Sequence, residues 1–465
     1  MPSPGLVRTL RIRSHRKSDG LGFLTTALGD AGAAVGEITT VRIGHQYVLR
    51  EFQLLLEDET HLAHVLRGVE SLVDSDVVAV IDAVSAMHEG GKIRTQPQRK
   101  VNSLGDLYAA FSPGVREIVQ RITNDESAAD LFTSRLRTVA IVSDGTGLLG
   151  VGKVPPVAML PVLEGKATLL STLAGLSSLC LPLDVESEDA LISVLTHAAP
   201  AFGAILLDSV AAPRGPRCAV RLAERLKIPV FHDDADSPAV VALAAVINAC
   251  KRTGLDLQKV QVGQVGLGTA GGSIARLLMR YLQRPVLGDD VHPAALSRHI
   301  SCGGKACSLE EIMARADVVI ANTGHGGVIP VSLVRKGQVI IALSEPEPEI
   351  EPHEAILAGA AYAADGRTIS LSVAFPGVLL GALSVKAKMI SDDMKTAAAV
   401  AMAEAADDDD LVPTPFSEGL HAKIACAVAR AAVQGKVHSV AVAAETLTPA
   451  FFSALIQDKR VLGAA

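Results

Sequence analysis

The sequence predicts an α/β protein in which helices flank parallel sheets, and three observations lead to this fold class. First, apolar strand-like runs alternate with helical stretches from residue 136 onwards, which is the pattern of βαβ units. Second, a Gly-x-Gly-x-x-Gly turn at Gln264–Gly272 joins an apolar run to a helical segment. Third, hydrophobic residues make up 49% of the 465 residues and aromatic residues only 3%. The cores therefore consist of small and branched aliphatic side chains, as parallel sheets favour.

Length and charge limit the organisation and the partners of the chain. A chain of 465 residues is too long for one ordinary core, so we expect two or three domains. The net charge of −7 and the lack of a dense basic run argue against a nucleic-acid partner. The six cysteines show no zinc spacing, and the sequence has neither an apolar signal core nor a run of about 18 apolar residues. We expect a cytoplasmic protein with reduced thiols and no membrane partner.

Residues 1–86 are predicted to form a small domain of their own. Strands are expected at 7–12, 34–43, 47–56 and 77–81, and helices at 20–32 and 61–74. Ser18 or Asp19 would cap the first helix. This βαββαβ order, with a glycine-containing loop after the first strand, resembles an ACT domain. Such regulatory modules commonly bind amino acids at paired interfaces, so the resemblance implies an amino-acid effector.

Residues 87–236 and 237–465 are predicted as two further domains, with His88–Ile93 at the first boundary. A long apolar helix that begins at Pro238 would link them. Strands and helices alternate on both sides of this helix. The segments expected before it are 138–143, 160–173, 180–183, 191–197, 204–207 and 218–226, and the strands expected after the glycine turn are 285–287, 317–321 and 338–343.

The glycine turn predicts a dinucleotide site. Gly266 allows the tight turn, Gly268 lets a pyrophosphate approach the backbone, and Gly271 lets the helix pack on the strand. The pyrophosphate would then meet the unpaired N–H groups at the start of the helix, around Thr269 and Ala270. A purely structural tight turn is the alternative.

Acidic residues after the next strand indicate which dinucleotide is bound. Asp289 and Asp290 lie about 20 residues past the glycine turn, where a carboxylate can accept hydrogen bonds from a ribose hydroxyl. An acid there favours NAD over NADP, and a solvated loop acid is the alternative. Asn322, which follows the strand at 317–321, is assigned to the same cofactor site.

Six segments, taken in chain order, resemble the bacterial malic enzyme family from about residue 88 to the C-terminus. The resemblance implies a two-domain core with a Rossmann-like NAD-binding domain, a small-molecule acid as substrate, and a homodimer or homotetramer. Members oxidise malate with NAD(P) and then decarboxylate the resulting oxaloacetate on a divalent metal to give pyruvate. The matching segments are His88–Ile93, Phe111–Val115, Ser143–Gly150, Leu163–Ala167, Ile228–Asp234 and Ala374–Gly377.

The resemblance assigns the catalytic roles. The family's catalytic lysine corresponds to Lys166, whose pKa we expect its apolar surroundings to lower, as a general base requires. A surface lysine at a helix start is the alternative. The family's catalytic tyrosine corresponds to Phe111, which has no proton to give, and Tyr108 lies one helical turn away.

The resemblance also implies a site for Mg²⁺ or Mn²⁺, held in the family by a Glu–Asp pair and a later Asp. These positions are Leu207, Asp208 and Asp234 here, so one ligand is missing. Asp236 is a carboxylate that could replace it, and hard cations take oxygen ligands. Equally, Asp236 could cap the helix expected to begin at Pro238. The candidate metal ligands are Asp208, Asp234 and Asp236.

Several substrate-contacting positions also differ from the family. Lys153 stands in place of an aspartate, Glu345 replaces an asparagine, and residues 368–373 shorten a loop that carries asparagines in the family. The glycine turn stays intact. We therefore expect an NAD-dependent oxidoreductase for malate or a related 2-hydroxy acid, with altered or reduced activity. The alternatives are a catalytically inactive NAD-binding regulator and an enzyme repurposed to another substrate on the same fold.

Overall fold

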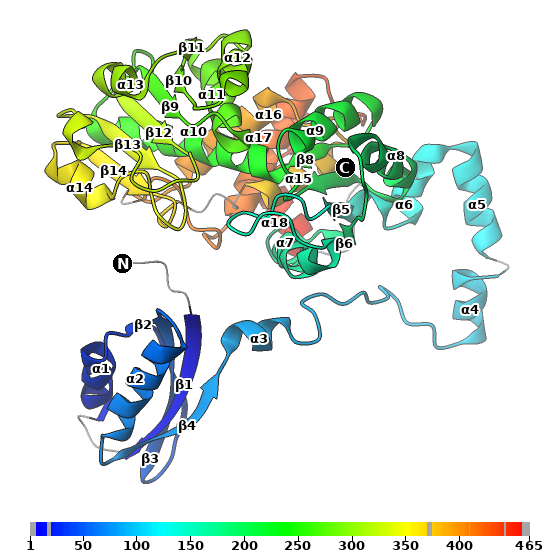
Figure 1. Cartoon of the computed structure of the whole chain (residues 1–465). Helices are drawn as coiled ribbons and strands as arrows, with labels where there is room; N and C mark the ends of the chain where they lie inside the picture. Colours follow the sequence, from blue (N-terminus) through cyan, green and yellow to red (C-terminus); the bar gives the residue numbers. More distant parts are fainter. Residues whose placement is uncertain are drawn as a thin grey trace. The chain divides into compact units, whose positions relative to one another are not determined.

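A computed structural model describes residues 6–15, 20–112, 114–369, 374–408, 410–440 and 443–457 (Figure 1). The chain divides into two compact units, Met1–Arg94 and Thr95–Ala465. Ser18 and Asp19, the predicted helix caps, lie outside the described residues, as do residues 370–373 of the shortened loop. The predicted boundary after residue 236 falls inside one helix, Asp233–Thr253 (α10), and the three-domain division stays a prediction.

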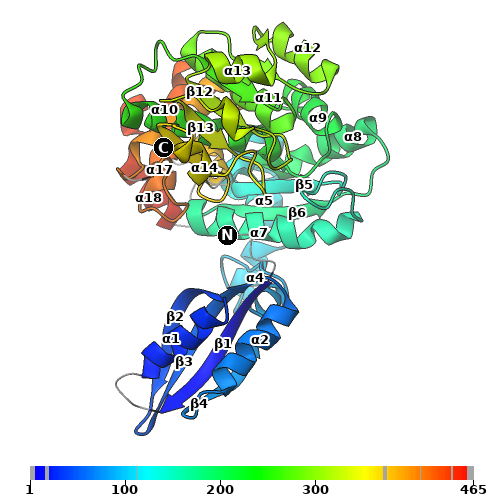
Figure 2. The same ribbon diagram turned by 60° about the vertical axis from the view of Figure 1, so that its left-hand side comes forward.

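The N-terminal unit is a four-stranded antiparallel sheet with two helices on one face (Figure 2). The strand order is β2-β3-β1-β4, and β1 pairs with both β3 and β4. The helices and these strands enclose one apolar core. The predicted βαββαβ order is confirmed by β1 (Leu6–His15), α1 (Gly20–Asp30), β2 (Ala34–Ile43), β3 (Tyr47–Leu56), α2 (Glu59–Glu70) and β4 (Ser75–Ile81).

Local sequence explains how these elements form. Leu10, Ile12 and Ser14 of β1 are buried in alternation, because side chains of a strand point to opposite faces with a period of two. Asp58 caps α2 by accepting a hydrogen bond from the His61 N–H at 2.7 Å. That cap starts α2 at Glu59, earlier than the predicted residue 61.

The first sheet of the larger unit is parallel, with the strand order β6-β5-β7-β8. Helix α7 covers one face of it, and α8 and α9 cover the other. Because both faces are covered, β5 and β7 are apolar and buried along almost their whole length. The elements are β5 (Thr138–Ser143), α7 (Leu160–Ala174), β6 (Ser177–Pro182), α8 (Glu188–Ala198), β7 (Ala204–Leu207), α9 (Arg214–Arg225) and β8 (Val230–His232).

The second sheet of this unit is also parallel, with the order β11-β10-β9-β12-β13-β14. In chain order this is the 3-2-1-4-5-6 arrangement of dinucleotide-binding folds, which confirms the Rossmann-like prediction. Its strands are β9 (Val262–Val265), β10 (Leu287–Asp289), β11 (Lys305–Ala306), β12 (Val318–Ala321), β13 (Val339–Ala342) and β14 (Tyr362–Asp365). Its helices are α11 (Thr269–Leu282), α12 (Pro293–Ser301), α13 (Leu309–Arg315) and α14 (Pro352–Leu357).

A bundle of helices joins the two sheets through one continuous apolar core. Helix α10 packs against α11 and α16, and α15 packs against α17 and α7. Glycine permits the closest of these approaches, since a Cβ on Gly381 would lie 2.5 Å from the Ala425 carbonyl oxygen. The C-terminal helices are α15 (Phe375–Ser384), α16 (Asp392–Glu404), α17 (Leu420–Gln434) and α18 (Pro449–Gln457).

One stretch of the described residues, Pro156–Ala174, is long and apolar enough to cross a membrane. Its side chains Leu163 and Leu170 are fully buried in the core beside β5, and Lys166 between them forms ion pairs with Asp208 and Asp233. It is therefore a core helix.

Helix α10 begins at Asp233, so the prediction that it begins at Pro238 is wrong. Pro238 lies inside the helix, where it lacks the N–H that would bond one turn back. Asp236 Oδ2 accepts the His232 N–H at 3.0 Å, which satisfies the backbone just before the helix. Its Oδ1 lies 2.5 Å from Lys395 Nζ on α16. This contact spans 159 residues, and local sequence could not show it.

We expect Lys395→Met to destabilise the larger unit by about 3–5 kcal/mol, because it leaves the Asp236 carboxylate buried without its partner. Both side chains belong to residues that are 7% exposed. Urea unfolding followed by circular dichroism measures the loss. Lys423→Met, at an exposed position on α17, is the matched control and should stay within about 0.5 kcal/mol of the parent. A Lys395→Met variant as stable as this control would contradict a buried charged pair.

Candidate functional site

Acidic side chains gather at one edge of the sheet β6-β5-β7-β8. Asp144 follows β5, Asp208 follows β7, and Asp233 and Asp234 follow β8 as the first residues of α10. Because the strands are parallel, their carboxyl ends meet at the same edge, which is where ligands bind in open α/β sheets. The strand order thus assembles residues that lie up to 90 positions apart in the chain.

Lys166 on α7 forms ion pairs with two of these carboxylates. Its Nζ lies 2.5 Å from Asp208 Oδ1 and donates a hydrogen bond to Asp233 Oδ2. The Phe375 ring at the start of α15 lies 5.8 Å from the same nitrogen. The ammonium is thus contacted from three elements. The Lys166 side chain is 15% exposed, so it retains limited access to solvent.

The pKa of Lys166 is shifted in the direction opposite to the expected one. Burial favours the neutral amine, but the carboxylates of Asp233 and Asp208 outweigh it and raise the pKa of Lys166. The expected lowering of this pKa is therefore wrong, because the apolar sequence neighbours do not reveal two counter-charges contributed by other strands. Burial also raises the pKa of Asp208 to about 6, against the opposing effect of Lys166 and with support from Asp234. The resting site is an ammonium between buried carboxylates.

The carboxylates of α10 have further protein partners. Asp233 Oδ1 accepts a hydrogen bond from Ser237 Oγ, one helical turn on. Asp234 Oδ2 accepts the Ser209 N–H at 2.8 Å. His232 Nε2 lies 3.4 Å from the same Asp234 oxygen. In the part of the chain that the structure describes, neither ring nitrogen of His232 forms a hydrogen bond, although the residue is only 2% exposed. The sequence interpretation did not single out Asp233 or His232, although both stand beside Asp234.

The three predicted metal ligands do not come together. Asp208 and Asp234 both border Ser209, but Asp236 is directed to Lys395 and to the His232 N–H. Leu207, at the position of the missing ligand, is fully buried in the core under α8 and α9, on the sheet face opposite α7.

Among the described residues, no group of three or more His, Cys, Asp or Glu side chains has an arrangement that could hold a metal ion. Leucine also offers no oxygen to a hard cation. The residues present therefore do not fit the Mg²⁺ or Mn²⁺ site that the resemblance implies.

Phe111 and Tyr108 lie away from Lys166 in the fold. Both belong to the region of helix α4 (Leu104–Ala110), where Phe111 is 70% exposed and Tyr108 is 54% exposed. Figure 1 shows α4 well separated from α7. Within one chain, neither aromatic side chain is placed to exchange a proton at the lysine–carboxylate cluster.

The glycine turn has the geometry that a dinucleotide requires. Gly266 has a φ of 83°, and a Cβ there would lie 2.4 Å from the Asn322 carbonyl oxygen. A Cβ on Gly271 would lie 2.0 Å from the Gly266 carbonyl oxygen. The fold itself therefore requires both glycines. Gly268 differs, because nothing lies within 4 Å of the place its Cβ would occupy, at the N-terminus of α11.

The two acids after β10 have different surroundings. Asp290 accepts the Leu267 N–H and the His292 N–H, each at 2.7 Å, so it stabilises the glycine turn itself. Asp289 is the last residue of β10 and is partly buried. Burial raises the pKa of Asp289, and nearby backbone N–H groups oppose this effect. Of the two, Asp289 is the acid whose carboxylate is not needed to hold the turn.

A buried glutamate that the sequence interpretation missed ties together the loops after β12 and β13. Glu349 is fully buried and accepts hydrogen bonds from the Thr323 N–H at 2.6 Å and the Ser344 Oγ at 2.5 Å. Thr323 follows Asn322, and Ser344 precedes Glu345. The acidic, proline-rich run around Glu349 is typical of a solvated loop, so no pattern in the sequence indicates this buried role.

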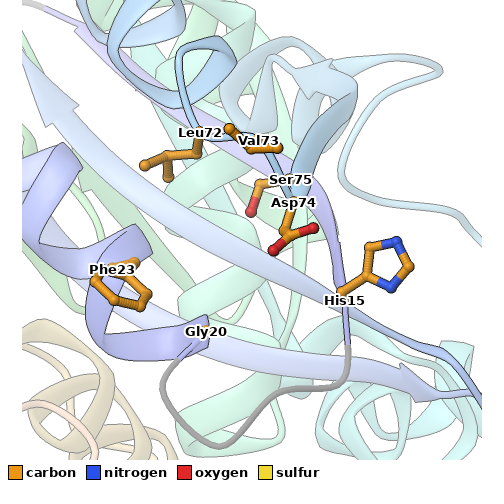
Figure 3. Close-up of a pocket in the computed structure, with 7 residues that line it drawn as sticks. All are labelled: His15, Gly20, Phe23, Leu72, Val73, Asp74 and Ser75. Carbon is orange, nitrogen blue, oxygen red and sulfur yellow. The ribbon is translucent and has the colours of Figure 1, made fainter.

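The N-terminal unit contains a pocket of its own, of about 180 Å³ (Figure 3). It lies between the end of β1, the start of α1 and the loop from α2 to β4. Figure 3 shows the oxygens of Asp74 and Ser75 directed toward the pocket and the ring of Phe23 across from them. Such a lining suits a small ligand with one polar and one apolar part. It consists of His15, Gly20, Phe23, Leu72, Val73, Asp74 and Ser75.

A Rossmann-type sheet with this glycine turn, joined to a second parallel sheet with a buried lysine–carboxylate cluster, is the architecture of the dinucleotide-binding class of α/β proteins. Comparison with known proteins gives the family. A model of the malic enzyme N-terminal domain matches residues 90–196. The chain is 42% identical to NAD-dependent malic enzyme 1 of Bacillus subtilis over 430 residues, which cover 92% of this chain and 98% of that enzyme. This chain belongs to the malic enzyme family.

Solved structures agree with this membership. The malic enzyme of Pyrococcus horikoshii matches with a TM-score of 0.74 at 31% identity. The match covers 79% of this chain and 92% of that enzyme's chain. The NAD-dependent malic enzyme of Thermotoga maritima has a TM-score of 0.70 at 31% identity, covering 75% of this chain and 99% of its own. The resemblance drawn from six sequence segments is confirmed.

We expect Gly268→Val to weaken NADH binding by more than about tenfold, which is about 1.4 kcal/mol, while leaving the fold intact. The valine would occupy the open space over the start of α11 that a pyrophosphate needs. Fluorescence titration with NADH and circular dichroism measure the two properties separately. Gly271→Val is the contrasting variant and should disrupt the fold, because its Cβ would overlap the Gly266 carbonyl oxygen. Unchanged NADH affinity in Gly268→Val would exclude this turn as the pyrophosphate site.

Proposed function

We propose that this protein is an NAD-dependent oxidoreductase of malic-enzyme type that acts on malate or a related 2-hydroxy acid. The observation that carries the proposal is the Lys166–Asp208–Asp233 cluster at the carboxyl edge of one sheet, combined with an intact glycine turn on the other. The name of the Bacillus subtilis relative supports NAD as the cofactor. NAD, when bound, supplies the acceptor for the hydride that leaves the hydroxyl-bearing carbon.

The cofactor would be held by backbone groups and one carboxylate. The N–H groups of Thr269 and Ala270 open α11 and would receive the pyrophosphate. Asp289 would accept hydrogen bonds from a ribose hydroxyl, while Asp290 keeps the turn in shape. Asn322, at the end of β12, borders the same turn through its contact with Gly266. These roles follow from position and local geometry.

Lys166 would bind the substrate oxygen. Its ammonium can donate a hydrogen bond to the C2 oxygen while Asp208 and Asp233 keep it in place. A fixed donor aimed at the atom where charge develops stabilises the transition state most effectively in a dry site. The burial of Asp208 and Asp233, 1% and 4% exposed, provides such surroundings.

We propose that oxidative decarboxylation of malate is slow or absent. Phe111 has no proton to give, and Glu345 introduces a carboxylate where the resemblance implies an amide that binds the acid substrate. The same two residues support the alternatives of a regulatory NAD-binding homologue without catalysis and of an enzyme repurposed to another substrate.

We also propose that the N-terminal pocket binds an amino-acid effector and that the protein is a homodimer or homotetramer. An amino acid has the ammonium group that Asp74 would attract and an apolar side chain that would suit Phe23 and Leu72. The exposed side chains of Val78 and Val80 on β4 give the unit an apolar surface that a second copy would cover.

We expect the native protein to turn over malate far more slowly than about 10 s⁻¹, the typical value for enzymes. A missing acid alone lowers the rate by about 10²–10⁴-fold. A steady-state assay of pyruvate formation at saturating malate with NAD and Mn²⁺ checks this, because oxidation without decarboxylation would also form NADH. Phe111→Tyr alone should not restore the rate, because Leu207 and Glu345 remain. Turnover of about 10 s⁻¹ in the native protein would contradict the proposed reduction.

We expect calorimetry with a panel of amino acids to show binding that Asp74→Ala weakens by about tenfold or more, since a charged hydrogen bond is lost. Asp76→Ala is the matched control, because the Asp76 side chain is exposed and pairs with Arg13 outside the pocket. Equal affinities in the two variants would place the effector elsewhere.

A further inference from the structure

We propose that this site works without a divalent metal and ends its reaction at the 2-oxo acid. The Lys166 ammonium takes the place of the family's metal at the C2 oxygen, and no decarboxylation follows. This inference rests on the proposed NAD-dependent oxidation of a 2-hydroxy acid and specifies how that reaction ends.

Oxygen donors are missing at Leu207 and already occupied at Asp236. Leu207 has none and is buried in the core away from Lys166. Asp236 uses one oxygen for Lys395 Nζ at 2.5 Å and the other for the His232 N–H at 3.0 Å. The missing ligand at Leu207 is therefore not replaced by Asp236. Of the other carboxylates at this edge, Asp233 pairs with Lys166 and Asp144 pairs with Arg214. A cation held by Asp208 and Asp234 would take most of its ligands from water.

Protein cations already neutralise these carboxylates. Lys166 contacts both Asp208 and Asp233, and Lys395 contacts Asp236. Both lysine side chains are buried, at 15% and 9% exposure, so solvent screens them little. A divalent cation would have to displace Lys166 from Asp208 or approach its positive charge closely. Either route opposes metal binding.

Decarboxylation requires groups that hydroxyl oxidation does not. When oxaloacetate loses the carboxylate that lies β to its 2-oxo group, an enolate remains, which the family stabilises with a metal acting as a Lewis acid. An acid must then protonate the enolate carbon. Phe111 cannot supply that proton, and the cation site is incomplete. Hydroxyl oxidation needs neither group, because a hydrogen-bond donor at the C2 oxygen and a proton acceptor are enough.

The proposed reaction is a reversible oxidation. The C2–H bond breaks and its electron pair reduces NAD⁺ to NADH. Lys166 gives one of its ammonium protons to the Asp208 carboxylate as it takes the hydroxyl proton, Asp208 then releases a proton to solvent, and the C2–O bond becomes a carbonyl. No C–C bond breaks, so malate would give oxaloacetate, and oxaloacetate with NADH would give malate.

The test of metal binding does not depend on activity. The full chain is freed of metal with EDTA and titrated with Mn²⁺, and free Mn²⁺ is followed by electron paramagnetic resonance. We expect no saturable binding up to about 1 mM, the weak end of protein cation sites. One tightly bound Mn²⁺ per chain that is lost in Asp234→Asn would overturn the proposal.

The test of the reaction follows NADH consumption with oxaloacetate in EDTA, with products identified by mass spectrometry. We expect malate as the product, no pyruvate above the enzyme-free control, and a rate that Mn²⁺ changes less than about twofold, within the scatter expected for an uninvolved ion. Lys166→Met should lower the rate by about 10²–10⁴-fold. Lys423→Met, at the exposed control position, should not.

Two failures are distinguishable. Turnover that EDTA abolishes and Mn²⁺ restores, or pyruvate formed in step with NADH from malate, would overturn this inference and leave the proposed function standing. A chain that binds no NADH and turns over no 2-hydroxy or 2-oxo acid would overturn both.

Discussion

The burial of helix α10 is the constraint on which the larger unit depends. Its first turn carries Asp233 and Asp234, and its remaining length runs through the core shared by the two sheets. Packing against α11 and α16 fixes its direction, and the Asp236–Lys395 pair anchors its start to α16. The position of the lysine–carboxylate cluster is thus set by contacts made along the whole helix.

Charge balance governs the chemistry of the edge where α10 begins. Burying a carboxylate is unfavourable unless it is paired, and each of Asp208, Asp233 and Asp236 has a lysine ammonium as partner. Asp234, whose side chain is 38% exposed, relies on a backbone N–H instead. This arrangement favours the charged form of Lys166 and holds its ammonium in place between two carboxylates. Such a group can donate a hydrogen bond to a substrate oxygen.

The sequence predicted the parts of the fold that depend on local periodicity. The bounds of β2, β3, β5 and β7 match the predicted segments because their alternating or continuous apolar runs leave little choice of register. The start of α10 was missed because its stabilising contacts are the His232 N–H and Lys395, and the second is remote in sequence. The family resemblance identified Lys166 and Asp208 as candidate site residues. It could not show that Asp233 would share the ammonium or that Glu349 would be buried, since both depend on how separate loops meet.

Gly268 separates what the architecture demands from what a ligand demands. Its φ of −63° is open to any amino acid, and a Cβ there would have no protein atom within 4 Å. The neighbouring Gly266 and Gly271 would have to be glycine even in a protein that bound nothing. A larger residue at position 268 would therefore act on whatever binds at the start of α11 and would leave the packing of the turn unchanged.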